Sequence, residues 1–195
     1  FIKSIVKDIQ YDGEIELGHQ VMIGYFAQDE SQKLDQELSV FETIDEVAVG
    51  EVRKKIRQIL GSFLFSGDDV EKKVKVLSGG EKTRLSLCKL LLQPNNFLIL
   101  DEPTNHLDMA SKEILKEALL DYKGTLLLVS HDRDFLDGLT EKVYFIKDQN
   151  VKTYHEKVSQ FIESYYGSIL EISAKSRKKR LKRATIKSNL ISRDR

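Results

Sequence analysis

The sequence has 195 residues, 41% of them hydrophobic and 32% charged, a length that suits one domain and leaves little room for a second complete one. No apolar run approaches the roughly 18–20 residues that a membrane helix needs, and the N-terminus lacks a signal-peptide pattern. The single cysteine, Cys88, excludes an internal disulfide framework and a Cys-rich zinc cluster. Together these features predict a soluble protein of a reducing compartment, the cytoplasm, with no membrane partner.

The formal net charge of zero hides an uneven distribution of charge along the chain. Residues 173–195 contain ten Lys or Arg and one acid, a net charge of +9, which leaves −9 on the other 172 residues. A segment this basic and this poor in large apolar residues predicts a solvated helix or a disordered tail. Such a tail either binds polyanions, for example RNA, or is only a solvated run of charge, and both interpretations stay open.

The first part of the chain predicts short elements. Apolar residues at helical spacing predict a helix over residues 1–9. Polar and apolar residues then alternate over 14–17 and 21–25, which predicts short antiparallel strands. Helical periodicity returns between residues 52 and 64, after a mostly polar stretch. We therefore predict a small helical subdomain over residues 35–76.

From residue 77 the pattern changes to alternating helices and buried strands. Ser78 and Glu81 have the spacing of a capping box and predict the start of a helix that ends by Pro94. Two apolar runs without polar alternation, separated by a helix, indicate a parallel sheet that is buried on both faces. The predicted fold class is therefore α/β, with a mostly parallel sheet core and antiparallel strands at its N-terminal side. The predicted elements are strands at 97–100 and 125–129, a helix over 114–122, and a closing hairpin of 143–146 with 151–154.

Two acidic residues, Asp101 and Glu102, directly follow the first buried strand. In open parallel sheets, ligands bind beyond the carboxyl ends of the strands, so these carboxylates are candidates for a binding site. Asp101 can hold Mg²⁺ through a water molecule, as Walker-B aspartates do, and Glu102 can polarise or deprotonate an attacking water. The pair can equally be an ordinary acidic strand end without a catalytic role.

The start of the helix after residue 77 is a second candidate site. Its two glycines, Gly79 and Gly80, let backbone N–H groups approach an anion closely, and the helix dipole favours negative charge at this end. Ser78 and Glu81 complete the segment. The same four residues also make an ordinary capping box with turn glycines, so the segment alone does not decide between phosphate binding and capping.

Single polar residues follow two other predicted strands. His131 comes after the strand at 125–129, so its side chain and that of Glu102 would open on one cleft. Gln28 follows a predicted strand and precedes a polar loop. Taken singly, a structural histidine and a surface glutamine are the alternative interpretations.

Taken together, these segments resemble the ATP-binding cassette (ABC) ATPases in both order and spacing. The motifs that carry the resemblance are Gly24–Gln28 (Q-loop), Leu77–Lys82 (ABC signature), Phe97–Glu102 (Walker B with its catalytic glutamate), Pro103–Asp108 (D-loop region) and Ser130–Arg133 (H-switch). Within that family, the runs Glu-Pro-Thr-Asn-His-Leu-Asp and Ser-His-Asp-Arg-Asp-Phe-Leu are similar to the ABC-F proteins. Those proteins have two ATPase domains in one chain and no membrane domain, and many act on the ribosome.

The resemblance implies an ATP hydrolase that uses ATP and Mg²⁺. It implies that Glu102 is the catalytic base, that Asp101 and Gln28 help to position Mg²⁺ and water, and that His131 contacts the γ-phosphate. The implied partners are the other ABC domain of the same chain and the ribosome or its RNA, in an ATP-gated clamp that acts in translation or ribosome protection. The residues implied to bind the nucleotide shared with the partner domain are Ser78, Gly79, Gly80, Glu81 and Asp108.

One motif of the family does not occur in the 195 residues: the loop Gly-x-x-x-x-Gly-Lys-Ser/Thr, which cradles the β- and γ-phosphates. In the family this loop directly precedes a helix like that of residues 1–9, so we expect the chain to be cut just after it, within the second ABC domain. The expected division is a partial ABC domain over 1–165 and a basic tail over 166–195. This piece alone is expected not to hydrolyse ATP.

Two alternatives of different class stay open. The first is the ATPase subunit of a membrane transporter, which would need a coupling-helix contact between Gln28 and Leu77, a segment that is short and acidic here. The second is a catalytically inactive interaction module, which requires that the phosphate-binding loop is naturally absent.

Overall fold

The computed structural model describes residues 1–167, and the predictions made for the basic residues 173–195 lie outside this range. The chain divides into two compact units, Phe1–Leu139 and Thr140–Arg195. The described part of the chain contains no helix that combines the length and the hydrophobicity of a membrane span.

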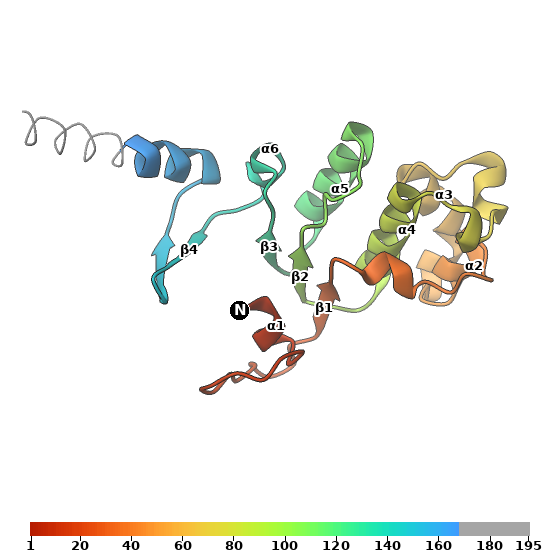
Figure 1. The fold of residues 1–195 in the computed structure, drawn as a ribbon. Helices are drawn as coiled ribbons and strands as arrows, with labels where there is room; N and C mark the ends of the chain where they lie inside the picture. Colours follow the sequence, from red (N-terminus) through yellow and green to blue (C-terminus); the bar gives the residue numbers. More distant parts are fainter. Residues whose placement is uncertain (168–195) are drawn as a thin grey trace, which may run out of the picture. The chain divides into compact units, whose positions relative to one another are not determined.

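The first unit is built on a three-stranded parallel sheet. Its strands, in spatial order, are β1 (Ile23–Phe26), β2 (Phe97–Asp101) and β3 (Thr125–Val129) (Figure 1). Phe26 pairs with Leu100, and Leu100 pairs in turn with Leu128. Because the strands run in the same direction, their carboxyl ends lie along one edge of the sheet. The predicted α/β fold class with a parallel sheet is confirmed.

The N-terminal strands differ from the prediction. Residues 14–22 contain no strand, so the predicted strand at 14–17 is wrong, and β1 pairs parallel to β2 instead of joining an antiparallel pair. The side chain of Asn96 explains this alignment, because its Oδ1 accepts the Met22 N–H at 2.9 Å and its Nδ2 donates to the Gln20 carbonyl at 2.9 Å. These bonds tie the entry of β1 to the entry of β2, so the two strands start side by side.

Helices α4 (Gly79–Leu92) and α5 (Met109–Asp121) pack against the sheet. Each helix contributes leucines that are at most 8% exposed, and burying such a side chain contributes about 1.5–3 kcal/mol. α5 begins earlier than the predicted residue 114, because the Asp108 carboxylate caps it by accepting the Ser111 N–H at 2.8 Å. The core consists of Phe26, Leu87, Leu90, Leu98, Leu100, Leu107, Leu115, Leu119 and Phe135, the last from α6 (Arg133–Leu136).

A second hydrophobic cluster joins residues 34–77 to Leu85 and Cys88 of α4. Its apolar side chains come from short elements, since no helix in this region is longer than seven residues. Ser39 starts the first of the two α-helices with a capping box to Glu42. The elements are α2 (Val40–Asp45), α3 (Ile56–Ser62) and the 3₁₀ helices η1 (Glu30–Lys33), η2 (Gly50–Lys55), η3 (Gly67–Glu71) and η4 (Val74–Val76); α1 (Ile2–Ile5) lies at the N-terminus and is shorter than predicted.

The second unit contains the predicted hairpin, which is confirmed. β4 (Val143–Lys147) and β5 (Asn150–Tyr154) pair antiparallel, with Val143 opposite Tyr154. A helical segment follows at residues 158–167. The Phe161 ring of this segment lies 5.4 Å from that of Phe145 and 4.8 Å from that of Tyr154, measured between ring centroids. Aromatic packing of this kind stabilises one face of the hairpin.

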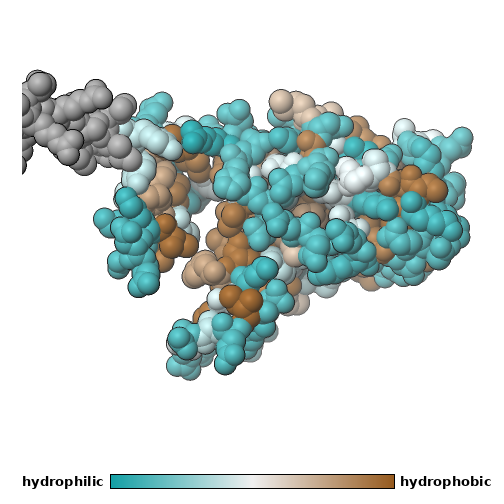
Figure 2. All heavy atoms as spheres, viewed as in Figure 1, coloured by the Kyte–Doolittle hydropathy of each residue, from teal (hydrophilic) through white to brown (hydrophobic). Residues whose placement is uncertain are grey.

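β3 forms an apolar edge of the sheet. Within the described residues it pairs with β2 alone, and none of its five residues is buried. Figure 2 shows hydrophobic side chains gathered at the surface along β3 and α1. Val129 is 42% exposed and Phe1 67% exposed. Such an edge is a surface on which a further strand can pair.

Cys88 is expected to be inert toward alkylating reagents while the protein is folded. The residue is fully buried in α4, and this burial raises the pKa of the thiol to about 12, because a thiolate loses its hydration in the apolar core. Only the thiolate is nucleophilic, so iodoacetamide at pH 8 should modify Cys88 in urea and leave it unmodified without urea. Mass spectrometry of the intact protein gives the measurement; rapid labelling of the native protein would contradict the burial.

Candidate active site

The carboxyl ends of the three strands bring the predicted residues to one edge of the sheet. Gln28 lies two residues beyond the end of β1, Glu102 directly follows β2, and His131 lies two residues beyond the end of β3. Because the strand ends are level in the register, these three residues enter the same region. The structure thus places Glu102 and His131 next to each other, with the Glu102 carboxylate in contact with His131.

Glu102 lies at the centre of this edge in a constrained conformation. Its backbone φ is 52°, a left-handed value that costs a residue other than glycine about 1–3 kcal/mol. Its N–H donates to the Val129 carbonyl at 2.8 Å, and its carbonyl accepts the Asn105 N–H at 3.2 Å. These two bonds hold the backbone in a conformation that aims the side chain across the end of β3.

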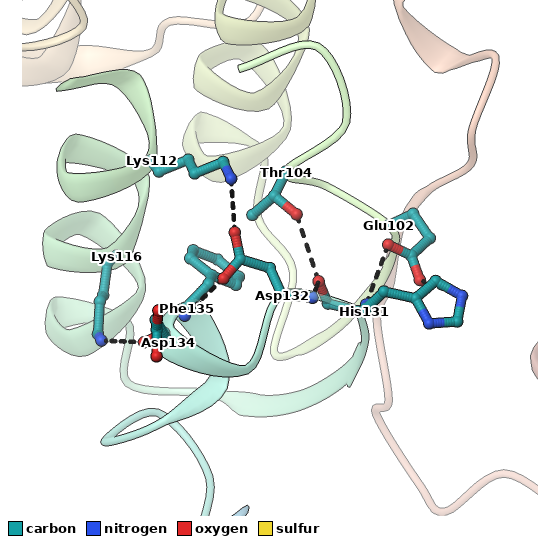
Figure 3. Close-up of polar contacts among 9 residues, drawn as sticks. Glu102, Thr104, Lys112, Lys116, His131, Asp132, Asp134 and Phe135 are labelled. Atoms are coloured by element: carbon teal, nitrogen blue, oxygen red, sulfur yellow. Dashed lines mark hydrogen bonds and ion pairs between the residues drawn. The ribbon is translucent and has the colours of Figure 1, made fainter. Parts of the chain in front are cut away.

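The Glu102 carboxylate is buried and incompletely hydrogen-bonded. The side chain is 10% exposed, and its Oε2 accepts the His131 N–H at 3.3 Å. Its Oε1 lies 3.5 Å from Nε2 of His131 and has no hydrogen-bond partner (Figure 3). A buried carboxylate oxygen without a partner is costly, so this atom is the place where a water molecule or another donor would be stabilised.

The His131 ring is almost fully open to solvent. Its side chain is 99% exposed, so neighbouring side chains do not fix the imidazole by packing. Its position depends on the backbone of residues 130–132, which the Glu102 carboxylate contacts from one side. The ring is therefore free to meet a ligand that enters from solvent.

Asp101 and Gln28 supply further oxygen atoms at the same edge. Asp101 is half-buried at the end of β2, and Gln28 is exposed. The nearby Asp101 carboxylate adds to the effect of burial in raising the pKa of Tyr25, the residue of β1 that precedes Phe26. Carboxylate and amide oxygens suit Mg²⁺, which is usually held by one or two carboxylates together with substrate phosphates.

The described residues contain no group of three or more His, Cys, Asp or Glu side chains that could hold a metal ion. Asp101 and Gln28 offer one carboxylate and one amide oxygen, a donor set that fits a cation that arrives with a phosphate ligand and keeps part of its water shell. It does not fit a cage made by protein side chains alone. In such a site the ion would supply positive charge beside the phosphate oxygens.

The segment Ser78–Glu81 forms the predicted capping box, which is confirmed. The Ser78 hydroxyl accepts the Glu81 N–H at 3.3 Å, and the Glu81 carboxylate accepts the Ser78 N–H at 2.7 Å. These hydrogen bonds from Ser78 hold the pKa of Glu81 below its ordinary value. The Glu81 carboxylate is thus engaged at the helix start, whereas Ser78 and Gly79 are exposed to solvent.

The segment Pro103–Asp108 packs against this helix start, a contact that the sequence analysis did not predict. A Cβ atom on Gly80 would lie 2.8 Å from the His106 carbonyl oxygen. His106 itself has a left-handed φ of 66°. The Asp108 carboxylate caps α5, and the Ser111 hydrogen bonds lower its pKa. No short-range sequence signal marks the contact, since 26 residues separate the two positions.

The fold is that of the ATP-binding cassette domains. The family model described as "ABC transporter" matches residues 3–105, and the chain belongs to this ATP-binding cassette family. It is a partial ABC domain, and its relatives are ABC-F proteins.

YdiF of Bacillus subtilis, named as an ATP-binding protein, is 48% identical over 154 residues, which are 78% of this chain and 24% of the length of YdiF. ABC transporter F family member 2 of Arabidopsis thaliana is 43% identical over 152 residues, 77% of this chain and 22% of its own length. The chain spans about a quarter of the length of these relatives.

Solved structures agree with this fold. The archaeal ribosome recycling factor aABCE1, solved with the ribosomal stalk protein aP1, matches with a TM-score of 0.65 and 21% identity, over 86% of this chain and 34% of its own. The ATP-binding cassette MJ0796, solved as a dimer with ADP and phosphate, matches with a TM-score of 0.54 and 23% identity, over 69% of this chain and 63% of its own. At these identities the likeness concerns the fold alone.

Proposed function

We propose that this chain is part of an ATP hydrolase in which Glu102 accepts the proton of the water that attacks the γ-phosphate. The observation that carries the proposal is the buried Oε1 atom of Glu102, which lacks a hydrogen-bond partner and lies next to His131. A general base must be within hydrogen-bond reach of the proton that it takes. An unpartnered carboxylate oxygen at the carboxyl end of a parallel strand meets this condition once a triphosphate binds there.

The other residues of the sheet edge would orient the substrate. Asp101 and Gln28 would hold Mg²⁺ and water, and His131 would donate a hydrogen bond from its exposed ring to the γ-phosphate. Such groups act by positioning and by compensating charge that develops in the transition state. The order in which they lie along the edge, Gln28 then Glu102 then His131, follows the strand order.

The signature segment would serve a second nucleotide, shared with the other ABC domain of the same protein. Ser78 and Gly79 are exposed at the start of a 14-residue helix, where backbone N–H groups and the helix dipole favour a phosphate. Asp108 and Glu81 would support this surface through the caps that they form. Closure of two domains would then depend on the γ-phosphate and end when it is released.

We further propose that the complete protein works as an ATP-gated clamp on the ribosome, in the cytoplasm. The support is the sequence identity to the ABC-F relatives together with ten Lys or Arg among residues 173–195, which suit contacts to RNA phosphates. The transporter-subunit alternative has less support, because relatives named as F family members match 77% of this chain. An inactive interaction module would not need the unpartnered Glu102 oxygen.

Phosphate release that depends on Mg²⁺ tests the proposed activity. In the full-length protein, Asp101→Asn is expected to raise the Mg²⁺ concentration needed for half-maximal release by roughly 10–100-fold, the effect typical of a lost partner that acts through a metal-bound water. Asp121→Asn, at the exposed end of α5, is the matched control and should change nothing. The 195-residue chain alone should release no phosphate; release at the wild-type rate by either the Asp101 variant or the chain alone would contradict the proposal.

A further inference from the structure

The loop that carries His131 is fixed from the side opposite to Glu102 by a set of hydrogen bonds centred on Asp132 (Figure 3). Oδ1 of Asp132 accepts the Phe135 N–H at 3.1 Å and so caps α6. Oδ2 accepts a hydrogen bond from Nζ of Lys112, on α5, at 2.5 Å. The backbone N–H of Asp132 donates to the Ser130 hydroxyl at 3.1 Å. Both carboxylate oxygens of Asp132, the residue next to His131, therefore accept hydrogen bonds.

The Lys112–Asp132 ion pair is less exposed than eight other Lys or Arg pairs of the described residues. The two side chains are 28% and 23% exposed, whereas in each of those eight pairs at least one partner is 48% exposed or more. Partly buried pairs are screened less by solvent and salt than surface pairs. The hydrogen bond from Lys112 is also the main reason why the pKa of Asp132 lies below its ordinary value.

This ion pair connects the His131 loop to the segment that follows Glu102. Lys112 lies one turn into α5, and its N–H donates to the carbonyl of the helix cap, Asp108, at 3.0 Å. A second link runs from the same segment, because the buried Thr104 hydroxyl lies 3.3 Å from that of Ser130. The loop that carries His131 is thus held to residues 103–112 at two points, one charged and one neutral.

We propose that Lys112 is a positioning residue: through Asp132 it fixes the backbone that presents His131 beside Glu102. This inference rests on the proposed ATP hydrolysis. The His131 ring is 99% exposed and its Nε2 lies 3.5 Å from the Glu102 carboxylate, so packing does not hold the ring and its position depends mainly on its backbone. Misplacing a reacting or orienting group by about 1 Å can lower a rate by up to 10²-fold.

The test uses the full-length protein and the variants Lys112→Met, Lys112→Arg and Lys116→Met. Lys116 is the matched control, since it lies one turn further along α5 and its Nζ bonds the carbonyl of Asp134, not the Asp132 carboxylate. Lys112→Met should lower kcat about tenfold and leave the dissociation constant of ATP within about twofold of the wild type. Lys112→Arg should restore most of the rate, because a guanidinium can bond the same carboxylate. Lys116→Met should behave as the wild type.

A second arm separates positioning from general destabilisation. In a His131→Ala background, Lys112→Met should produce no further loss of rate, whereas a merely structural defect would lower the rate in both backgrounds. Asp132→Asn provides a second way to break the pair and should reproduce the effect of Lys112→Met. If the wild type hydrolyses ATP and Lys112→Met has the same kcat, the inference is wrong and the proposed function stands. The same holds if Lys112→Met lowers kcat equally in the wild-type and His131→Ala backgrounds. A wild type that releases no phosphate would overturn both.

Discussion

Glu102→Gln is expected to slow ATP hydrolysis by the full-length protein roughly 10²–10⁴-fold, the contribution of a general base. The amide has nearly the same shape and can still accept the His131 N–H, but it cannot take a proton from water. The left-handed backbone at this position is unaffected, because both residues have a Cβ atom and meet the same strain. Single-turnover phosphate release gives the rate, and binding of a fluorescent ATP analogue should show that nucleotide affinity persists.

The control for this variant is Glu113→Gln, an exposed carboxylate on α5, which should retain the wild-type rate. A wild-type rate of hydrolysis in Glu102→Gln would show that Glu102 is not the catalytic base.

The same variant also tests the ribosomal clamp, because a protein that binds ATP without hydrolysing it should stay closed. It should sediment with ribosomes in ATP and not in ADP, and equal sedimentation in both nucleotides would contradict an ATP-gated clamp.

Gly80→Ala and Gly79→Ala are expected to change stability in opposite directions. A Cβ atom at Gly80 would lie 2.8 Å from the backbone carbonyl oxygen of His106, and a backbone atom cannot move aside as a side chain can. Overpacking of this kind costs about 1–3 kcal/mol. A Cβ atom at Gly79 would meet nothing within 4 Å, so alanine there should gain about 0.5–1 kcal/mol from reduced backbone entropy in the unfolded chain.

Urea unfolding of the full-length protein, followed by circular dichroism, measures both effects. Gly80→Ala should also lower ATP hydrolysis, because displacing His106 moves the segment that links Glu102 to α5. The neighbouring glycine is the control for stability only, since Gly79 belongs to the proposed phosphate-binding surface. Equal unfolding midpoints for the two variants would contradict the close contact between α4 and His106.

Local signals in the sequence were sufficient for the elements that carry the site. The capping box of Ser78 with Glu81 depends on residues three positions apart. The apolar runs at 97–100 and 125–129 correctly indicate parallel strands, but burial on both faces holds for β2 and is wrong for β3, which lies at the edge of the sheet and has no buried residue. Once two such strands are parallel, geometry alone puts Glu102 and His131 at the same edge. The convergence of these two residues was therefore predictable without any knowledge of packing.

Contacts between distant segments were not predictable in this way. The alternation at 14–17 has the period of a strand, but these residues find no partner strand in the described chain. The direction of β1 depends on the Asn96 side chain, 70 positions beyond the last residue of the strand. The close contact of Gly80 with His106 and the ion pair of Lys112 with Asp132 likewise form only when the helices pack. No local sequence pattern predicts them.

The central claim is that Glu102 and His131 meet the γ-phosphate of one bound nucleotide at the carboxyl edge of the sheet. A structure of the full-length Glu102→Gln variant with Mg²⁺ and ATP tests it most directly. We expect a water in line with the γ-phosphate, within roughly 2.6–3.2 Å of the side chain at position 102, with the His131 imidazole hydrogen-bonded to the same phosphate. A triphosphate bound with both side chains facing away from it would contradict the claim.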